Sequence, residues 1–262
     1  MTIAPGLCSI TFRSLSADEV LDLAARAGVE GIEWGADGHA PPGGGAALEA
    51  LAARCADAGV EVVSHGSYLG FAPPAGDDAA AVDAVLDSVQ ALGAPMVRIW
   101  TELGVTPESS ADNRGRVVER TAMFADAIAA RGLIAALEFH PFTLTHTAAS
   151  ANEVLATLAR ANLRTHWQPD PALPAAAALA ELTAVTPSLA HLHLFTWGAG
   201  GIGERRPLAD GADLWTAALS LADREGASLP GRRFALCEYV RDDDPEQFVT
   251  DVQTLRRWLA NL

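Results

Sequence analysis

The sequence predicts a single (β/α)₈ barrel that spans residues 1–262. Three observations lead to this fold class: short apolar runs alternate with amphipathic runs rich in alanine and leucine, eight runs of each kind follow one another, and the length is that of one α/β barrel. Strands that alternate with helices favour parallel pairing through right-handed crossovers. A doubly wound open sheet is the alternative, but the number of strands and the length favour a closed barrel.

The predicted strands are apolar or β-branched over most of their length, as expected when both faces of a parallel sheet are covered. Their ranges are Leu7–Phe12, Gly31–Trp34, Val60–His65, Met96–Thr101, Ile134–Phe139, Leu163–Gln168, Leu189–Phe195 and Phe234–Tyr239. Barrel enzymes carry their chemistry where the carboxyl ends of the strands meet. The polar residues that end these runs are therefore the first candidates for a functional site.

The predicted helices carry start and stop signals. Ser16 stands three residues before Glu19, which is a capping-box pattern, and Gly59, Gly93 and Gly132 each follow a helical run where a positive φ is favoured. The helical ranges are Ser16–Ala27, Ala46–Ala58, Asp78–Leu92, Asp112–Arg131, Ser150–Arg160, Pro174–Ala184, Leu214–Arg224 and Pro245–Leu259.

The composition excludes several classes of partner. The formal net charge is −15, and all 18 basic residues are arginine because the sequence has no lysine. Such an acidic chain repels phosphate backbones, so we expect no nucleic acid partner. The three cysteines form neither a C-x-x-C motif nor a disulfide framework. Since no signal-peptide pattern and no apolar run of about 18 residues is present, we expect a cytoplasmic protein without a membrane segment.

Polar side chains end the last four predicted strands. Glu138, Gln168, His193 and Glu238 occupy these ends, and Asp170 follows Gln168 by two positions. Carboxylates and an imidazole that converge on one point need a cation between them, because buried charges need partners. Oxygen ligands with one imidazole suit Mn²⁺, Mg²⁺, Co²⁺ or Zn²⁺. The pattern therefore predicts one divalent metal at the carboxyl end of the barrel.

Five further residues are candidates for contacts to a substrate. His65 could bind a hydroxyl group, His140 lies on the same side as Glu138, Trp100 and Trp197 could form aromatic walls around a sugar, and Arg205 could bind a phosphate or carboxylate. Each has a structural alternative: a core histidine, ordinary packing of tryptophan, or a solvated arginine.

Two more acidic residues could line a pocket: Glu33 ends the predicted strand Gly31–Trp34, and Glu102 follows the predicted strand Met96–Thr101. A solvated loop position is the simpler expectation for both. His166 and His191 are expected to have structural roles inside the barrel.

In their order and spacing, six segments of the chain resemble the xylose isomerase-like barrel superfamily, in its sugar phosphate isomerase/epimerase branch. These segments are Gly6–Phe12, Ala27–Trp34, Leu137–His140, His191–His193, Arg206–Gly211 with Trp215, and Leu236–Tyr239. The resemblance implies a divalent metal held by Glu138, His193 and Glu238. Gln168 stands where the family has an aspartate, and its amide oxygen can ligate a metal but adds no charge. Asp170 is the alternative ligand at that place.

The resemblance also implies a reaction. Glu138 and Glu238 would flank the substrate, one removing the proton next to a carbonyl group and the other returning it on the opposite face. The expected activity is isomerisation or epimerisation of a small sugar, keto-sugar or sugar acid.

Other functions remain open on the same fold. A lyase, such as an inosose dehydratase or a C-glycoside-cleaving enzyme, begins with the same proton abstraction. A sugar-binding barrel with a degraded metal site is a further alternative, whereas an enzyme of the endonuclease IV type would need a basic DNA face that this acidic chain lacks. Barrels of this type often dimerise, so a homodimer is also an expectation.

Overall fold

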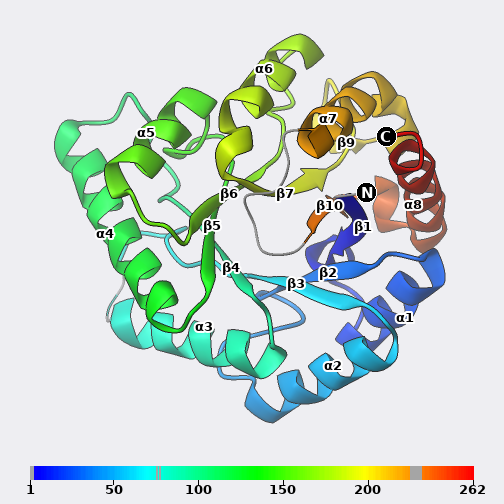
Figure 1. The fold of residues 1–262 in the computed structure, drawn as a ribbon, viewed down its shortest axis with the longest axis horizontal. Coiled ribbons are helices and arrows are strands. Elements are labelled where there is room, and N and C mark those ends of the chain that lie inside the picture. Colours follow the sequence, from blue (N-terminus) through cyan, green and yellow to red (C-terminus); the bar gives the residue numbers. More distant parts are fainter. Residues whose placement is uncertain (1–2, 75, 77, 225–231) are drawn as a thin grey trace.

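The computed structural model describes residues 3–74, 76, 78–224 and 232–262. Eight parallel strands form a closed barrel in the order β1-β10-β7-β6-β5-β4-β3-β2, and eight α-helices surround it (Figure 1). The predicted (β/α)₈ barrel is thereby confirmed. None of the helices in the described part of the chain is long and apolar enough to cross a membrane.

The barrel strands are β1 (Ile3–Cys8), β2 (Gly31–Gly35), β3 (Glu61–Gly66), β4 (Met96–Ile99), β5 (Ile134–Glu138), β6 (Leu163–Trp167), β7 (Leu189–Leu194) and β10 (Arg233–Cys237). The helices are α1 (Ala17–Ala27), α2 (Gly45–Asp57), α3 (Asp78–Leu92), α4 (Ala111–Ala130), α5 (Ala148–Leu158), α6 (Ala175–Val185), α7 (Ala212–Arg224) and α8 (Pro245–Leu259).

The helix signals read from the sequence are confirmed. Ser16 and Glu19 form a reciprocal capping box at the start of α1. Gly59, Gly93 and Gly132 have φ values of 69°, 69° and 73°, which is the left-handed region that glycine adopts at low cost.

The first strand is displaced from its predicted range. The prediction of Leu7–Phe12 is wrong, because β1 begins at Ile3 and ends at Cys8, and Ser9–Phe12 form a 3-10 helix. The neighbouring strand explains the shift: Ile3 to Leu7 pair in parallel with Arg233 to Cys237 of β10. The sequence also gave no sign of the antiparallel hairpin formed by β8 (Trp197–Gly198) and β9 (Gly201–Arg205).

The interior of the barrel changes from apolar to polar along the strands. Met96 and Ala136 pack together in one buried apolar cluster, and Leu236 belongs to another. Side chains alternate along a strand, so the next residues with the same orientation are Arg98, Glu138 and Glu238. Three strands thus turn charged groups toward the carboxyl end of the barrel.

Candidate active site

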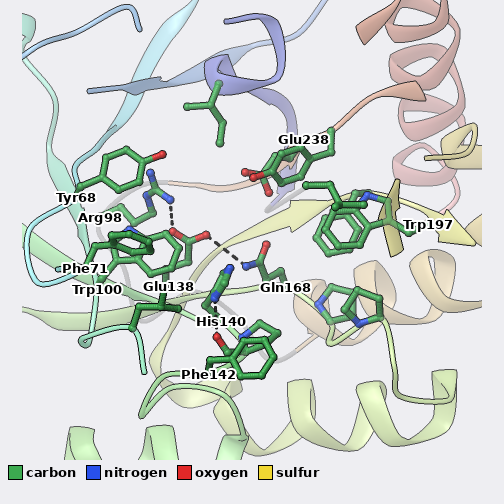
Figure 2. A pocket seen from close by; sticks show the side chains of 18 residues that line it. Tyr68, Phe71, Arg98, Trp100, Glu138, His140, Phe142, Gln168, Trp197 and Glu238 are labelled. Atoms are coloured by element: carbon green, nitrogen blue, oxygen red, sulfur yellow. Dashed lines mark hydrogen bonds and ion pairs between the residues drawn. The ribbon is translucent and has the colours of Figure 1, made fainter. Parts of the chain in front are cut away.

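A cavity of about 420 Å³ opens at the carboxyl end of the barrel (Figure 2). Its polar groups come from Arg98, Glu138, Gln168 and Glu238, all of them buried. Its walls are mainly aromatic and apolar, with the rings of Tyr68, Phe71, Trp100, His140, Phe142, Phe195, Trp197 and Tyr239. A small, charged base below aromatic walls is the usual build of a ligand site.

Glu138 is held by two neighbours. Its Oε2 atom forms an ion pair with Nη1 of Arg98, and its Oε1 atom accepts a hydrogen bond of 3.3 Å from Nε2 of Gln168 (Figure 2). The Gln168 amide nitrogen also donates to the backbone oxygen of Phe139 at 2.6 Å. Both carboxylate oxygens of Glu138 are therefore engaged by donors of the protein.

His193 lies between acidic groups and is fully buried. Its Nδ1 atom is 3.6 Å from Oε2 of Glu238 and 3.9 Å from Oε1 of Glu138, and its Nε2 atom is 3.6 Å from Oε1 of Glu33. Burial opposes a charge on this imidazole, but the carboxylates of Glu238 and Glu33 outweigh it and raise the pKa of His193 to about 9. His193 is thus a cation at neutral pH.

Glu238 is the second cavity carboxylate. Burial raises its pKa to about 7, even though the positive charge of His193 acts in the opposite direction. Its Oε2 atom has no hydrogen-bond partner in the described part of the protein. A carboxyl group of this kind can release or take up a proton near neutral pH.

Glu33 lies at the centre of the charged layer, so the expectation of a solvated loop position is wrong. It is fully buried, with Oε1 at 3.3 Å from Nε of Arg98 and Oε2 at 3.3 Å from Nδ1 of His166, and it accepts a hydrogen bond from Ser64. A register shift in the pairing of β2 with β3, between Ile32 and Glu33, sets Glu33 beside Ser64.

The same expectation is wrong for Glu102. This residue is also buried, and its two oxygens accept hydrogen bonds of 2.6 and 2.8 Å from Arg116. Glu102 does not line the active-site cavity. Its partner is the arginine of a neighbouring helix.

The structure brings some predicted residues together and separates others. Trp100, Trp197 and His140 line the cavity with the two glutamates and Gln168. His65 does not line it; its Nε2 atom lies 2.9 Å from the backbone oxygen of Ala40, in agreement with the structural alternative.

Arg205 and Asp170 are engaged outside the cavity. Arg205 pairs with Asp243, and its guanidinium lies 5.2 Å from the ring centre of Tyr239, which does line the cavity. Asp170 turns toward the loops, where Oδ2 lies 2.9 Å from Nε2 of His146 and Oδ1 accepts from the backbone of Ala172.

Arg98 is the site residue that sequence reasoning missed. Its side chain is 1% exposed, and its guanidinium lies between the carboxylates of Glu33 and Glu138. A signal was present, because an arginine inside the short apolar strand Met96–Ile99 needs a buried acidic partner. The sequence did not tell which of the many acidic residues that partner is.

The predicted ligands do not fit a divalent metal as they stand. One oxygen of Glu138 is paired with a cation, and the amide nitrogen of Gln168 donates to the other oxygen of Glu138 and to the backbone of Phe139. Among the described residues, donor atoms of Cys8, Glu33 and His193 lie within 4.8 Å of one another. In that group burial raises the pKa of the Cys8 thiol well above its usual value, and Glu33 is already paired with Arg98.

Comparison with known proteins identifies the family. Residues 21–260 match the family described as the xylose isomerase-like TIM barrel, and the chain belongs to this family. No curated protein matches the sequence.

Three solved structures illustrate the likeness of fold. The probable 3-DHS dehydratase AsbF from Bacillus anthracis is 17% identical, with a TM-score of 0.78 over 97% of this chain and 98% of that one. An L-ribulose 3-epimerase is 16% identical, with a TM-score of 0.72 over 99% and 95% of the two chains. A xylose isomerase-like TIM barrel protein from Mycobacterium smegmatis, in complex with magnesium, is 15% identical, with a TM-score of 0.73 over 98% and 97%.

Proposed function

We propose that this chain is an isomerase or epimerase of a small sugar, keto-sugar or sugar acid, and that Glu138 and Glu238 move the proton next to the carbonyl group. The observation that carries the proposal is that these two buried carboxyl groups border one cavity. They come from the ends of β5 and β10, with β6 and β7 between them in the barrel, so they reach the cavity from different directions. This placement suits an acid and a base that act on two faces of one carbon atom.

The surroundings of the two groups favour different roles. Glu138 forms an ion pair with Arg98, a contact that suits a base. Glu238, whose pKa is raised to about 7 by burial, holds a proton that it can give back. In one direction Glu138 takes the proton from carbon, the C–H electron pair moves onto the carbonyl oxygen, and Glu238 returns a proton to the other face.

The size and lining of the cavity favour a small polyhydroxylated substrate. The cavity volume of about 420 Å³ lies in the range of small-molecule sites. The indole N–H groups of Trp100 and Trp197 have no hydrogen-bond partner in the described part of the chain, and both residues line the cavity. An indole can pack on the C–H face of a sugar ring and still donate to a hydroxyl group.

Deuterium exchange tests this proposal. The protein is incubated in D₂O with a panel of ketoses, aldoses, keto-inositols and sugar acids, and NMR follows exchange at the carbon next to the carbonyl group. An isomerase or epimerase yields an isomer of the substrate that has gained deuterium and lost no other atoms. A lyase yields a product that has lost water or a leaving group.

Variants link the exchange to the two glutamates. Glu138→Gln and Glu238→Gln should each slow the exchange by about 10² or more, the range typical of a lost acid or base. Glu102→Gln is the matched control, because Glu102 is also a buried glutamate paired with an arginine but lies outside the cavity. Exchange at the wild-type rate in both Glu138→Gln and Glu238→Gln would refute the proposal.

A further inference from the structure

We propose that the guanidinium of Arg98 is the cation of this active site, in place of a divalent metal, and that it binds the carbonyl or carboxylate oxygen of the substrate. The first half concerns the protein alone. The second half rests on the proposed function, since it names the group that the substrate presents.

Arg98 already pairs with two carboxylates of the acidic cluster. It reaches from β4 to Glu138 on β5 through Nη1 and to Glu33 on β2 through Nε, at 3.3 Å. Two of the three carboxylates in this cluster, those of Glu33 and Glu138, are thus paired with the guanidinium, and the imidazole of His193 lies 3.6 Å from Glu33 and from Glu238. A divalent ion placed next to Arg98 would meet a like charge in a buried setting, which is strongly unfavourable.

The fold provides a fitted space for the guanidinium. A Cβ atom on Gly66 would lie 2.8 Å from Nη2 of Arg98 and 3.0 Å from Oε1 of Glu33, so a larger residue at this position would have to displace the ion pair. The rings of Tyr68 and Trp100 lie 5.7 and 5.5 Å from the Arg98 guanidinium carbon. Contacts of this kind stabilise a cation beside an aromatic face.

The guanidinium retains donors for a ligand. Nη2 of Arg98 is buried and has no hydrogen-bond partner among the residues that the structure describes, and Arg98 borders the cavity. A buried donor without a partner costs about 1–3 kcal/mol, and this cost is removed when a ligand supplies an acceptor. A carbonyl or carboxylate oxygen is the acceptor that a guanidinium fork suits best.

This position gives Arg98 a defined part in the proposed reaction. When the base removes the proton from carbon, negative charge collects on the carbonyl oxygen. A fixed guanidinium next to that oxygen stabilises the charge as it forms, and no group of the protein has to rearrange. The charge returns to carbon when the proton is given back, so Arg98 neither gains nor loses a proton.

The first test measures metal binding and needs no substrate. The full chain is stripped with EDTA and titrated with Mn²⁺, and free Mn²⁺ is followed by electron paramagnetic resonance. The wild type should bind Mn²⁺ at least about ten-fold more weakly than Arg98→Ala, because the variant leaves the carboxylates of Glu33 and Glu138 without the cation that pairs with them. Guanidinium chloride at millimolar concentration should displace Mn²⁺ from Arg98→Ala by occupying the vacated space.

Tight binding of Mn²⁺ by the wild type would contradict the inference. If the wild type binds about one equivalent of Mn²⁺ tightly and His193→Ala loses it, the metal is the cation of the site and the inference is overturned. Should Arg98→Ala fail to fold, the wild-type titration still decides, and Arg98→Lys, which keeps the charge, serves as the second variant.

The second test uses whichever substrate the exchange panel identifies. EDTA should leave the wild-type exchange rate unchanged, and Arg98→Ala should lose exchange that guanidinium chloride partly restores. Exchange that is abolished by EDTA and restored by Mn²⁺ would overturn the inference while leaving the proposed function intact. Absence of exchange in the wild type with the whole panel counts against the proposed function alone, because the Mn²⁺ titration does not depend on it.

Discussion

A methyl group on Gly66 would lie 2.8 Å from Nη2 of Arg98, so the guanidinium can occupy its place as it does because position 66 has no side chain. We predict that Gly66→Ala displaces Arg98 and lowers the free energy of unfolding by about 1–3 kcal/mol, the usual cost of overpacking. Urea denaturation measures the loss. Gly38→Ala is the control, since a Cβ atom there meets nothing within 4 Å. Wild-type stability of Gly66→Ala would mean that Arg98 is not confined.

The stability of the protein should fall as the pH rises from about 6.5 to about 9. The folded state holds the proton of His193 with a pKa of about 9, against a usual value of 6.5. Because the folded state binds more protons than the unfolded state in this window, the free energy of unfolding decreases with pH. The contribution is complete below pH 6.5 and lost above about 9.

Two measurements check this pH dependence. Urea unfolding of the wild type across the window should give the slope, and His193→Asn should flatten it. Glu238 adds a slope of the same sign at lower pH, since its pKa is raised from 4.5 to about 7. A wild-type stability that is constant between about pH 6.5 and 9 would contradict the ion-paired state of His193.

Asp170→Asn should leave proton exchange at the wild-type rate. Asp170 engages His146 and the backbone of Ala172, and it does not line the cavity. Loss of the partly exposed pair with His146 should lower the stability by no more than about 1 kcal/mol. A loss of exchange as large as that of Glu238→Gln would return Asp170 to the site.

Trp197→Ala should weaken substrate binding more than it slows the reaction. Trp197 stacks on Phe195 with ring centres 4.3 Å apart, and both form one wall of the cavity. We expect KM to rise by about ten-fold, in line with the loss of one large aromatic contact, and kcat to change less. Trp258→Ala, on α8 and outside the cavity lining, is the control. An unchanged KM would exclude Trp197 from the binding surface.

The fold was predictable because it repeats one local pattern. Apolar runs and helix signals such as the Ser16 capping box are encoded within a few residues, and they appear where expected. The start of β1 could not be predicted, because the register of this strand depends on pairing with Arg233 to Cys237 at the other end of the chain. Strand boundaries set by distant partners leave little trace in the local sequence.

The site, too, contains residues that could be predicted from the sequence and residues that could not. Glu138, Gln168, His193 and Glu238 stand at strand ends, and closure of the barrel brings strand ends together, so their convergence could be predicted. Glu33 and Arg98 are 65 positions apart and pair only through the barrel interior. The apolar neighbours of Arg98 indicate that it needs a buried acidic partner, but nothing in the local sequence identifies Glu33 as that partner.

The cation next to the cavity is a guanidinium, and the sequence contains no lysine, so imine formation with a carbonyl substrate is affected. An amine beside a ketone or aldehyde condenses to an imine, whereas the guanidinium of Arg98 stays protonated and cannot do so under ordinary conditions. The protein therefore has no lysine amine that could attack the carbonyl group of a reducing sugar. Borohydride reduction in the presence of a reducing sugar should therefore trap no imine on a side chain of this protein.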